Sequence, residues 1–508
     1  MKEEYIFIGV DIGTTGVRAA AYEKNGTLFY YADEYYSIEM PRPNYAEQNH
    51  ELIFNKTKKV IKEVANKLLY LRKKPFGISL SVAMHSFALA KKDKFLSNML
   101  IWADGRASKL VKDYKAKSDN IKYFYDKTCC PPHSCYPYFK MLYFKQNYEN
   151  LDFDRVYSLK DYIFEQLTGF WCIDKSCACA SGFYNANDLN WDDDLLYSLG
   201  LKKENLPEVK DTIFNLGLKE EIAKELNLAP GLPVVIGSSD GVLVNLGISC
   251  FKEGQMSATI GTSGALRLIS NGVKKDSSAR TWCYNLLDDT WVVGGAINNG
   301  GIVLKWLRDK ICHYSTSNLE NIDIDAYELM SLKASKVAVG SEGLLALPFF
   351  TGERAPHWNS ELKGMFFGLG LNHSRSHMIR AVMEGICYGL KSIYNPLSSF
   401  KEPTSIKVSG SFTKSSVWIQ ILADILNRDI ILPKNSEGAA YGAAILGFIS
   451  LGLIDNLDDL EELEGERIFH AQSENFDLYN RIFKIYENLY SKLQDEFAQI
   501  YEIGENKI

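Results

Sequence analysis

The chain has 508 residues, of which 46% are apolar and 24% are charged, and its net charge is −6. This is the composition of a soluble globular protein with room for two large domains, and the acidic balance argues against a nucleic-acid-binding surface, which would be basic. No apolar run reaches the roughly 18 residues of a membrane span, and residues 1–4 lead into the first strand without a signal-peptide core, so we expect a cytoplasmic protein without membrane contact.

Residues 5–18 predict a strand that runs into a tight hairpin. Four apolar residues are followed by Asp11, a Gly-Thr-Thr-Gly turn and then Arg18. Such a hairpin suits a phosphate chain, because glycine lets the backbone N–H groups approach an anion and the hydroxyls of Thr14 and Thr15 face the same side. Asp11 could hold Mg²⁺, which prefers oxygen ligands, and Arg18 could neutralise phosphate charge. For this segment alone, an ordinary β-hairpin is an equally good interpretation.

The next elements are an amphipathic helix over residues 50–70 and a strand over residues 76–81 that ends at a Met-His-Ser sequence containing His85. A loop over residues 101–106 then carries Trp102, Asp104 and Arg106. This set is typical of polyol recognition, because an indole face packs on C–H groups and charged groups take hydroxyls or a carboxylate. The alternative is a packed tryptophan beside a surface salt bridge.

Six of the ten cysteines lie between residues 129 and 179, with His133 among them. Their spacing does not match the paired cysteines of a zinc site, and disulfides are not expected in a cytosolic chain. We therefore predict buried free thiols. In the same region, helices are expected over residues 139–148, from 158 to about 169, and from 191, with a loop over residues 176–182.

Residues 232–237 predict a buried strand that runs through two serines to Asp240 and Gly241, followed by a helix over residues 242–246. Open α/β sheets bind ligands at the carboxyl ends of their strands, so Asp240 is well placed to act as a general base. The alternative is that Asp240 only caps the helix.

Residues 259–264 repeat residues 11–16 almost letter for letter, with Thr259 in the place of the acid. The strand over residues 76–81 has its own echo at residues 406–409. The chain therefore reads as two related halves, which we place at residues 1–248 and 249–508. Two such hairpins could clamp one polyphosphate from opposite sides, and only the first would hold the metal.

The second half continues with alternating strands and helices. A small-residue helix beginning at Glu437 would let backbones pack closely, and the tail has helical periodicity that indicates docking on the core. The elements expected are strands over residues 292–296 and 344–349, and helices over residues 302–309, 374–400 and 482–501.

In combination, these motifs resemble the FGGY carbohydrate kinases from Tyr5 to about Gly447. The matching segments include GVDIGTTGVR, IWADGR, SSDGVLVNLG, ATIGTSGALR and FFTGERAPHW. The resemblance implies an α/β fold with two ribonuclease-H-like, actin-like ATPase domains and an interdomain cleft, and it implies ATP and Mg²⁺. Within the family, the MHS, PPH, YPYFK and IGTSGALR segments look most like the gluconokinases. Xylulokinases and glycerol kinases share the scaffold and differ in the sugar-side loops.

The resemblance also implies a role for each matching residue. Asp240 corresponds to the general base and Asp11 to the acid associated with Mg²⁺. The family often has a second glycine at the position of Ser411. The phosphate loops correspond to Thr14, Thr15, Arg18 and Thr262, the nucleotide-binding positions to Gly301, Gly410 and Ser411, and the sugar contacts to His85, Asp104 and His133. The other expected substrate-binding residues are Trp102 and Arg106, from the chemistry of their loop, and Asp240, as the base.

The expected activity is ATP-dependent phosphorylation of D-gluconate to 6-phosphogluconate. Arg267 or Arg106 could read the substrate carboxylate as a bidentate partner. The alternatives are a xylulokinase or another FGGY polyol kinase, an actin-like or chaperone-like ATPase that moves a partner, and a degenerate kinase that acts as a sensor. The expected partners are a small sugar or sugar acid and ATP; the oligomeric state is left open, with a homodimer among the options.

Overall fold

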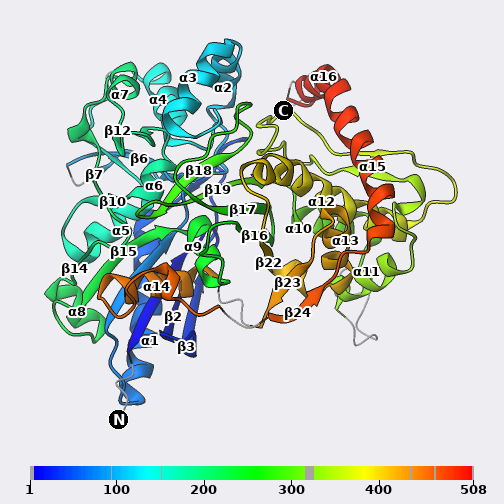
Figure 1. The fold of residues 1–508 in the computed structure, drawn as a ribbon. Coiled ribbons are helices and arrows are strands. Elements are labelled where there is room, and N and C mark those ends of the chain that lie inside the picture. Colours follow the sequence, from blue (N-terminus) through cyan, green and yellow to red (C-terminus); the bar gives the residue numbers. More distant parts are fainter. Residues whose placement is uncertain are drawn as a thin grey trace.

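The computed structural model describes residues 5–92, 94–149, 151–314, 325–434, 438–462 and 465–505. Figure 1 shows two lobes side by side, the first formed mainly by the N-terminal half of the chain and the second mainly by the C-terminal half. A six-stranded sheet forms the centre of the first lobe, and a seven-stranded sheet forms the centre of the second. The predicted two-lobed α/β architecture is confirmed.

The two sheets share a strand pattern. The first has the order β14-β15-β5-β1-β2-β3, and the second has the order β18-β19-β17-β16-β22-β23-β24. In each, a central strand pairs in parallel on one side and antiparallel on the other. The strands of the first sheet are β1 (Ile6–Ile12), β2 (Gly16–Glu23), β3 (Leu28–Tyr35), β5 (Gly77–Val82), β14 (Asn215–Gly217) and β15 (Pro233–Ser239). Those of the second are β16 (Gln255–Ile260), β17 (Gly264–Asn271), β18 (Trp282–Leu287), β19 (Thr290–Ile297), β22 (Ser405–Ser409), β23 (Ile430–Pro433) and β24 (Gly465–Phe469).

The internal repeat extends to the register of single residues. Asp11 lies opposite Ser81 in the parallel pair β1–β5, and Thr259 lies opposite Ser409 in the parallel pair β16–β22. Each first strand then turns back into its antiparallel neighbour, which makes the two expected hairpins. The repeated halves are therefore confirmed at the level of strands, whereas the domain boundary at residue 248 stays a prediction.

The helices cover both faces of these sheets. The predicted helix at residues 50–70 is α1 (His50–Tyr70), which Asn49 caps and which packs its apolar face against β2 and β3. In the first half the others are α2 (Ser108–Lys115), α3 (Ser118–Thr128), α4 (Pro137–Asn147), α5 (Leu159–Thr168), α6 (Lys175–Cys179), α7 (Asp193–Leu199), α8 (Glu220–Leu226) and α9 (Asp240–Gly247). In the second half they are α10 (Gly301–Trp306), α11 (Ala326–Ser335), α12 (Arg375–Phe400), α13 (Ser416–Leu426), α14 (Gly438–Ser450), α15 (Ser473–Lys492) and α16 (Gln494–Glu505).

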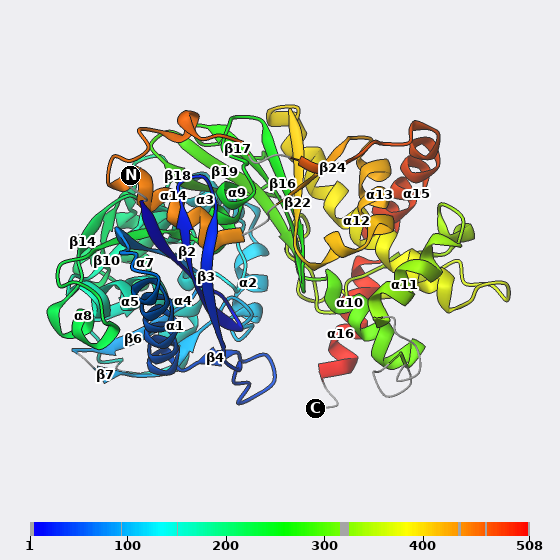
Figure 2. The ribbon, with the colours of Figure 1, turned by 90° about the horizontal axis from the view of Figure 1, so that it is seen from below.

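Helix α14 belongs to the second half of the sequence but packs on the first sheet. It contacts β1, β5 and α9, and Figures 1 and 2 both show it within the first lobe. Small residues make this crossing close. A Cβ on Gly9 would lie 1.9 Å from the carbonyl oxygen of Ala440, and a Cβ on Gly442 would lie 2.1 Å from that of Leu243. The predicted role of the small-residue helix is thus confirmed, although Glu437 lies outside the described residues.

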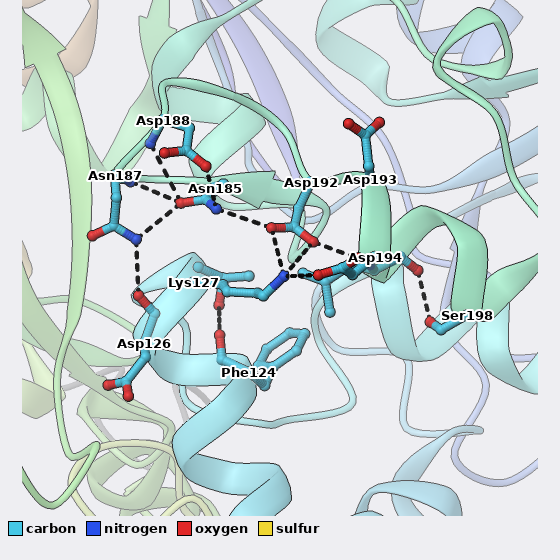
Figure 3. Close-up of polar contacts among 12 residues, drawn as sticks. Phe124, Asp126, Lys127, Asn185, Asn187, Asp188, Asp192, Asp193, Asp194 and Ser198 are labelled. Atoms are coloured by element: carbon cyan, nitrogen blue, oxygen red, sulfur yellow. Dashed lines mark hydrogen bonds and ion pairs between the residues drawn. The ribbon is translucent and has the colours of Figure 1, made fainter.

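A polar network joins α3 to the start of α7 (Figure 3). Lys127 donates to the carboxylates of Asp192 and Asp194, and Asn185 donates to Asp192. From the second half, Lys275 donates to the side-chain oxygen of Asn187 at 2.7 Å. The loop that joins β17 to β18 therefore contacts the first lobe at this network.

Some expectations about secondary structure were wrong. Residues 176–182 were expected to form a loop, but most of the segment belongs to the short helix α6, which Asp174 caps. The C-terminal helix breaks near Leu493 into α15 and α16. The strand expected at residues 344–349 is β20 (Leu345–Leu347), which pairs only with β21 (Met365–Phe367) outside the main sheet. Among the described residues, no helix is long and apolar enough to cross a membrane.

All ten cysteines are free and buried, as predicted.

The remaining short elements lie mostly around the first sheet. A π-helical turn, Leu307–Cys312, continues α10. The other short strands are β4 (Glu47–Gln48), β6 (Ala88–Lys91), β7 (Lys94–Phe95), β8 (Met99–Leu100), β9 (Arg155–Tyr157), β10 (Cys172–Asp174), β11 (Tyr184–Asn185), β12 (Asn190–Trp191) and β13 (Glu208–Lys210).

Candidate active site

The two hairpins are built alike, and each exposes one threonine at its tip. The N–H of Gly13 donates to the carbonyl of Gly16 at 2.9 Å, and the N–H of Gly261 donates to that of Ser263 at 2.9 Å. The side chains of Thr15 and Thr262 are exposed at the tips. Exposed hydroxyls beside glycine backbone N–H groups are what a phosphate chain requires.

Asp11 ends its strand next to a second acid. Its Oδ1 accepts a hydrogen bond from Ser81 at 2.7 Å. Desolvation and the negative charge of Asp240 raise the pKa of Asp11 to about 6. Two carboxylates that raise each other's cost of ionisation form a site where a cation is stabilising.

Asp240 is the first residue of α9, and Ser239 takes the cap position, so the alternative of a capping aspartate is not what the structure shows. Its Oδ1 accepts from the N–H of Gly241 at 2.7 Å. Desolvation raises the pKa of Asp240, although Gly241, Arg267, Met84 and Arg354 oppose the shift. The carboxylate is thus held by backbone N–H groups at the carboxyl end of β15, facing the positive charges of two arginines.

The residues present fit Mg²⁺. The described residues contain no group of three or more His, Cys, Asp or Glu side chains that could hold a metal ion. Mg²⁺ does not need such a group, because it is usually bound by one or two carboxylates together with water and substrate phosphates. Asp11 is the candidate ligand, since Asp240 lowers the cost of placing a cation beside it.

His85 has a defined tautomer. Its Nδ1 lies 2.7 Å from the carbonyl oxygen of Ala180, which can only accept, so Nδ1 carries the proton. Desolvation lowers the pKa of His85 to about 3, so the ring is neutral and Nε2 is a hydrogen-bond acceptor. The backbone of His85 has a positive φ of 67° and is held by Lys140, whose Nζ donates to its carbonyl at 2.6 Å.

His133 has the opposite tautomer to His85, so its Nε2 is a hydrogen-bond donor. Its Nδ1 accepts from the N–H of Cys135 at 3.2 Å, so Nε2 carries the proton and is a donor. Desolvation holds the pKa of His133 well below its usual value, so this ring is neutral as well. His85 also lowers the pKa of His133. The ring centroid of Trp358, from the second half of the chain, lies 5.5 Å from that of His133. The two imidazoles thus offer one acceptor and one donor to a hydroxylated ligand.

Trp102 connects the sugar-side loop to the first hairpin. Its Nε1 donates to Oγ1 of Thr14 at 3.0 Å, and the guanidinium of Arg354 lies 4.7 Å from its ring centroid. The indole therefore stands between a phosphate hairpin of the first lobe and an arginine of the second.

Asp104 and Arg106 are paired with each other, so their expected role as sugar contacts stays a prediction, which this pairing weakens. Asp104 is 1% exposed, accepts from Ala46 and forms two hydrogen bonds with the guanidinium of Arg106. Arg106 also pairs with Glu47 and stacks on Tyr45. Both charges are neutralised within the lobe, so this pair holds the loop of Trp102 in place. A cavity of about 360 Å³ lies beside Arg106, and its lining includes neither Asp11 nor Asp240.

Arg18 is also engaged elsewhere. Its Nε and Nη2 donate to both carboxylate oxygens of Asp33 at 2.6 and 3.0 Å, and its guanidinium lies over Tyr31. A bidentate ion pair leaves little charge for a phosphate. Neutralisation of phosphate by Arg18 stays a prediction, which this pairing weakens.

Arg267 lies beside Gly241, interacts electrostatically with Asp240 and has spare hydrogen-bonding capacity. Its Nη1 donates to Oγ1 of Thr259 at 3.3 Å. Its Nε is buried and has no hydrogen-bond partner within the described ranges. Desolvation and the charge of Arg354 lower the pKa of Arg267 to about 10, whereas Asp240 raises it. A buried N–H without a partner is costly, so this geometry suits an anionic or acceptor group of a ligand.

The expected nucleotide positions gather at the second hairpin. The N–H of Gly301 donates to the carbonyl of Gly261 at 2.7 Å. Gly410 has a φ of 98°, and a Cβ there would lie 2.5 Å from the carbonyl oxygen of Ile260. Ser411 follows it and is exposed. The structure therefore brings these residues together, and nucleotide binding by them stays a prediction.

Sequence reasoning missed Arg354, Glu353 and Lys140 as contributors to the site. Arg354 and Glu353 lie in the FFTGERAPHW segment, which was recognised as a motif without a role for either residue. Buried Lys140 donates to the carbonyls of His85 and Ile101, and a lysine in an apolar helix was the available signal.

We expect the acid limb of the pH profile of kcat/KM to lie near pH 6. Asp11, whose pKa is raised to about 6, gains a proton as the pH falls through this region, and a protonated carboxyl does not bind a cation. The pKa of Asp240 is raised as well, and its protonated form cannot accept a proton. More Mg²⁺ should move this limb to lower pH, because the cation competes with the proton. Initial rates between about pH 5 and 9 at low and high Mg²⁺ test this; a profile that is flat to pH 5 at both concentrations would contradict it.

Comparison with known proteins identifies relatives over nearly the full length. Residues 6–247 match the N-terminal domain, and residues 256–451 the C-terminal domain, of the FGGY family of carbohydrate kinases. A protein of Bacillus subtilis named gluconokinase is 35% identical over 505 residues, which cover 97% of each chain. A xylulose kinase of Staphylococcus epidermidis is 28% identical over 513 residues, which cover 98% of this chain and 99% of that protein.

A solved structure has the same architecture. The crystal structure of gluconate kinase from Lactobacillus acidophilus superposes with a TM-score of 0.90 at 30% sequence identity. The match covers 98% of this chain and 100% of that one. The two-lobed arrangement described above is therefore shared along the whole chain.

Proposed function

Because the chain belongs to the FGGY family of carbohydrate kinases, we propose that it transfers the γ-phosphoryl group of ATP to the primary hydroxyl of D-gluconate and forms 6-phosphogluconate. The observation that carries the choice of substrate is Arg267, a buried guanidinium with an unpartnered Nε beside Asp240. A sugar acid would bring a carboxylate to this charge. The name of the gluconokinase at 35% identity supports gluconate, whereas the xylulose kinase at 28% identity supports the second candidate, xylulose.

Asp240 would accept the proton of the attacking hydroxyl. Phosphoryl transfer depends on positioning and charge neutralisation more than on covalent chemistry, so a carboxylate at the hydroxyl and donors at the phosphates are the main requirements. The raised pKa of Asp240 suits a base that must gain a proton during the reaction. His85 Nε2 and His133 Nε2–H would orient the other hydroxyls, and Trp102 would pack on the C–H face of the substrate.

The exposed threonines Thr15 and Thr262 would donate to the phosphates from opposite sides, with backbone N–H groups of both hairpins. Asp11 would hold Mg²⁺, which neutralises phosphate charge when bound. Gly301, Gly410 and Ser411 would form the nucleotide side of the site, and the division into a sugar-binding half up to residue 248 and a nucleotide-binding half after it is part of the same proposal.

The substrate is tested by an acceptor panel in a coupled ADP assay with gluconate, xylulose, glycerol and no sugar. We expect gluconate to give the highest kcat/KM. In the Arg267→Gln variant, kcat/KM for gluconate should fall about tenfold to a hundredfold, the value of a hydrogen bond to a charged group, with a much smaller loss for xylulose.

Arg481→Gln is the matched control, since Arg481 is exposed on α15. An equal loss on gluconate and xylulose in Arg267→Gln would contradict a carboxylate reader. If the wild-type enzyme prefers xylulose, the proposed substrate is xylulose, the candidate that the xylulose kinase relatives favour. ADP release at the same rate without sugar would contradict the kinase and favour an ATPase of the actin-like type.

A further inference from the structure

Glu353 is a buried acid that does not pair with the guanidinium next to it. It is 2% exposed, and its Oε1 accepts from the N–H of Arg354 at 2.9 Å and from the N–H of Asn298. Its Oε2 accepts from Nδ2 of Asn299 at 3.0 Å. All of these partners are N–H donors that favour the carboxylate, and they oppose the desolvation that raises the pKa of Glu353 to about 7. A buried acid with only amide partners holds backbone in place.

Asn299 extends this contact and is fully buried. Its Nδ2 also donates to the carbonyl of Gly352 at 2.7 Å, and its Oδ1 accepts from the N–H and the hydroxyl of Thr351 at 3.1 Å each. The segments at residues 298–299 and 351–354 are thus joined by hydrogen bonds at both ends, and neither can shift without the other.

The turn held by Glu353 lies directly on the second hairpin. The N–H of Gly300 donates to the carbonyl of Thr262 at 3.2 Å, and the N–H of Gly301 donates to that of Gly261 at 2.7 Å. A Cβ on Gly300 would lie 2.5 Å from the carbonyl oxygen of Ser263, so the turn packs on the hairpin without side chains between them. Movement of residues 298–301 therefore moves the phosphate-binding tip.

The other end of the segment reaches the acceptor site. Nε of Arg354 donates to Oδ1 of Asn298 at 2.7 Å, which fixes the guanidinium over the ring of Trp102. Trp102 in turn donates to Thr14 of the first hairpin at 3.0 Å. The contacts therefore run without interruption from one hairpin to the other, through the indole on which the sugar would pack.

We infer that Glu353 is a positioning residue that couples occupation of the acceptor site to the nucleotide side of the active site, an inference that rests on the proposed function. A sugar packed on Trp102 holds the indole against the guanidinium of Arg354. The hydrogen bonds of the Glu353 carboxylate to the N–H groups of Arg354 and Asn298 connect this contact to residues 298–301 and the second hairpin. Binding of sugar and nucleotide is then cooperative, and by linkage each ligand tightens the other by the same factor.

The test compares the Kd of ADP with and without saturating gluconate in wild type, Glu353→Gln and the control Glu342→Gln, whose side chain is 48% exposed. We expect gluconate to tighten ADP binding by a factor in the usual range of about 5–150 in wild type and control, and by a factor near one in Glu353→Gln. In the variant, KM for ATP at saturating gluconate should rise by about the factor of coupling that is lost. In addition, kcat should fall about tenfold to a hundredfold, because an amide nitrogen would face the donor Nδ2 of Asn299.

A second variant covers the case in which Glu353→Gln does not fold. Asn298→Ala removes the side-chain anchor of Arg354 together with the hydrogen bond from Asn298 Nδ2 to the carbonyl of Thr351 at 3.3 Å, and it should also lower the coupling factor. A factor of one in wild type, or an unchanged factor in a folded Glu353→Gln protein, would overturn the inference. If the acceptor panel in the coupled ADP assay identifies another substrate, that substrate is used in place of gluconate in the ADP-binding measurement. If wild type phosphorylates none, the proposed function fails, and ADP affinity alone decides: a loss of about tenfold in Glu353→Gln supports positioning of the hairpin, and an unchanged affinity overturns it.

Discussion

Replacement of Asp240 by asparagine is expected to lower kcat by about 10²–10⁴-fold, the usual contribution of a general base. The amide keeps the size of the side chain, and it can still accept from the N–H of Gly241 through its oxygen. What it loses is the ability to take the proton of the attacking hydroxyl. Because the substrates are held mainly by other groups, KM for ATP should change little. Single-turnover rates with saturating gluconate measure the chemical step directly.

The matched control is Asp193→Asn, in which an exposed carboxylate of α7 that pairs with Lys203 loses its charge. This variant should keep wild-type kcat. Retention of more than about a tenth of wild-type kcat in folded Asp240→Asn would contradict the role of base. A large rise in KM with unchanged kcat would instead indicate that Asp240 only binds the acceptor.

The Gly442→Ala variant is expected to lose stability, against the usual trend for helices. Alanine normally stabilises a helix interior over glycine by about 1 kcal/mol. In α14, however, the new Cβ would lie 2.1 Å from the carbonyl oxygen of Leu243 on the crossing helix α9. Backbone cannot move away as a flexible side chain can, so we expect a net loss of about 1–3 kcal/mol. The same contact joins the second half of the chain to the first lobe, so activity should fall with it.

Gly504→Ala is the control for this prediction, because a Cβ on Gly504 in α16 meets no atom within 4 Å. It should leave the protein as stable as wild type or slightly more stable. The quantity to compare is the midpoint of urea unfolding, since a chain with two lobes need not unfold in one step. A midpoint of Gly442→Ala equal to or above that of wild type would contradict the close crossing of α14 and α9.

The sequence was informative wherever one local pattern had to be repeated. The Gly-Thr-Thr-Gly and Gly-Thr-Ser-Gly turns predicted two hairpins, and the structure places Asp11 and Thr259 at equivalent points of their sheets. Helix α1 followed from its apolar periodicity, and its cap at Asn49 agrees with the expected start. Such features depend on residues that are neighbours in the chain, so a single sequence contains them.

Features that depend on contacts between residues far apart in the chain could not be predicted from the sequence. Asp104 and Arg106 carry the right chemistry for sugar recognition, yet Glu47 and Ala46 use that chemistry for folding. Arg18 is paired with Asp33 from the next strand. Conversely, Arg354 acquires its place over Trp102 only because the second lobe folds against the first. Nor did periodicity show that α14 would leave its own half and pack on β1.

The central claim is direct transfer of a phosphoryl group from ATP to an acceptor hydroxyl at Asp240. It is tested by incubating the enzyme with ATP, Mg²⁺ and gluconate in water enriched in ¹⁸O and analysing the products by mass spectrometry. The account predicts equal amounts of ADP and 6-phosphogluconate, with no ¹⁸O in the transferred group. ADP accompanied by ¹⁸O-labelled inorganic phosphate, formed as fast without gluconate as with it, would contradict the account.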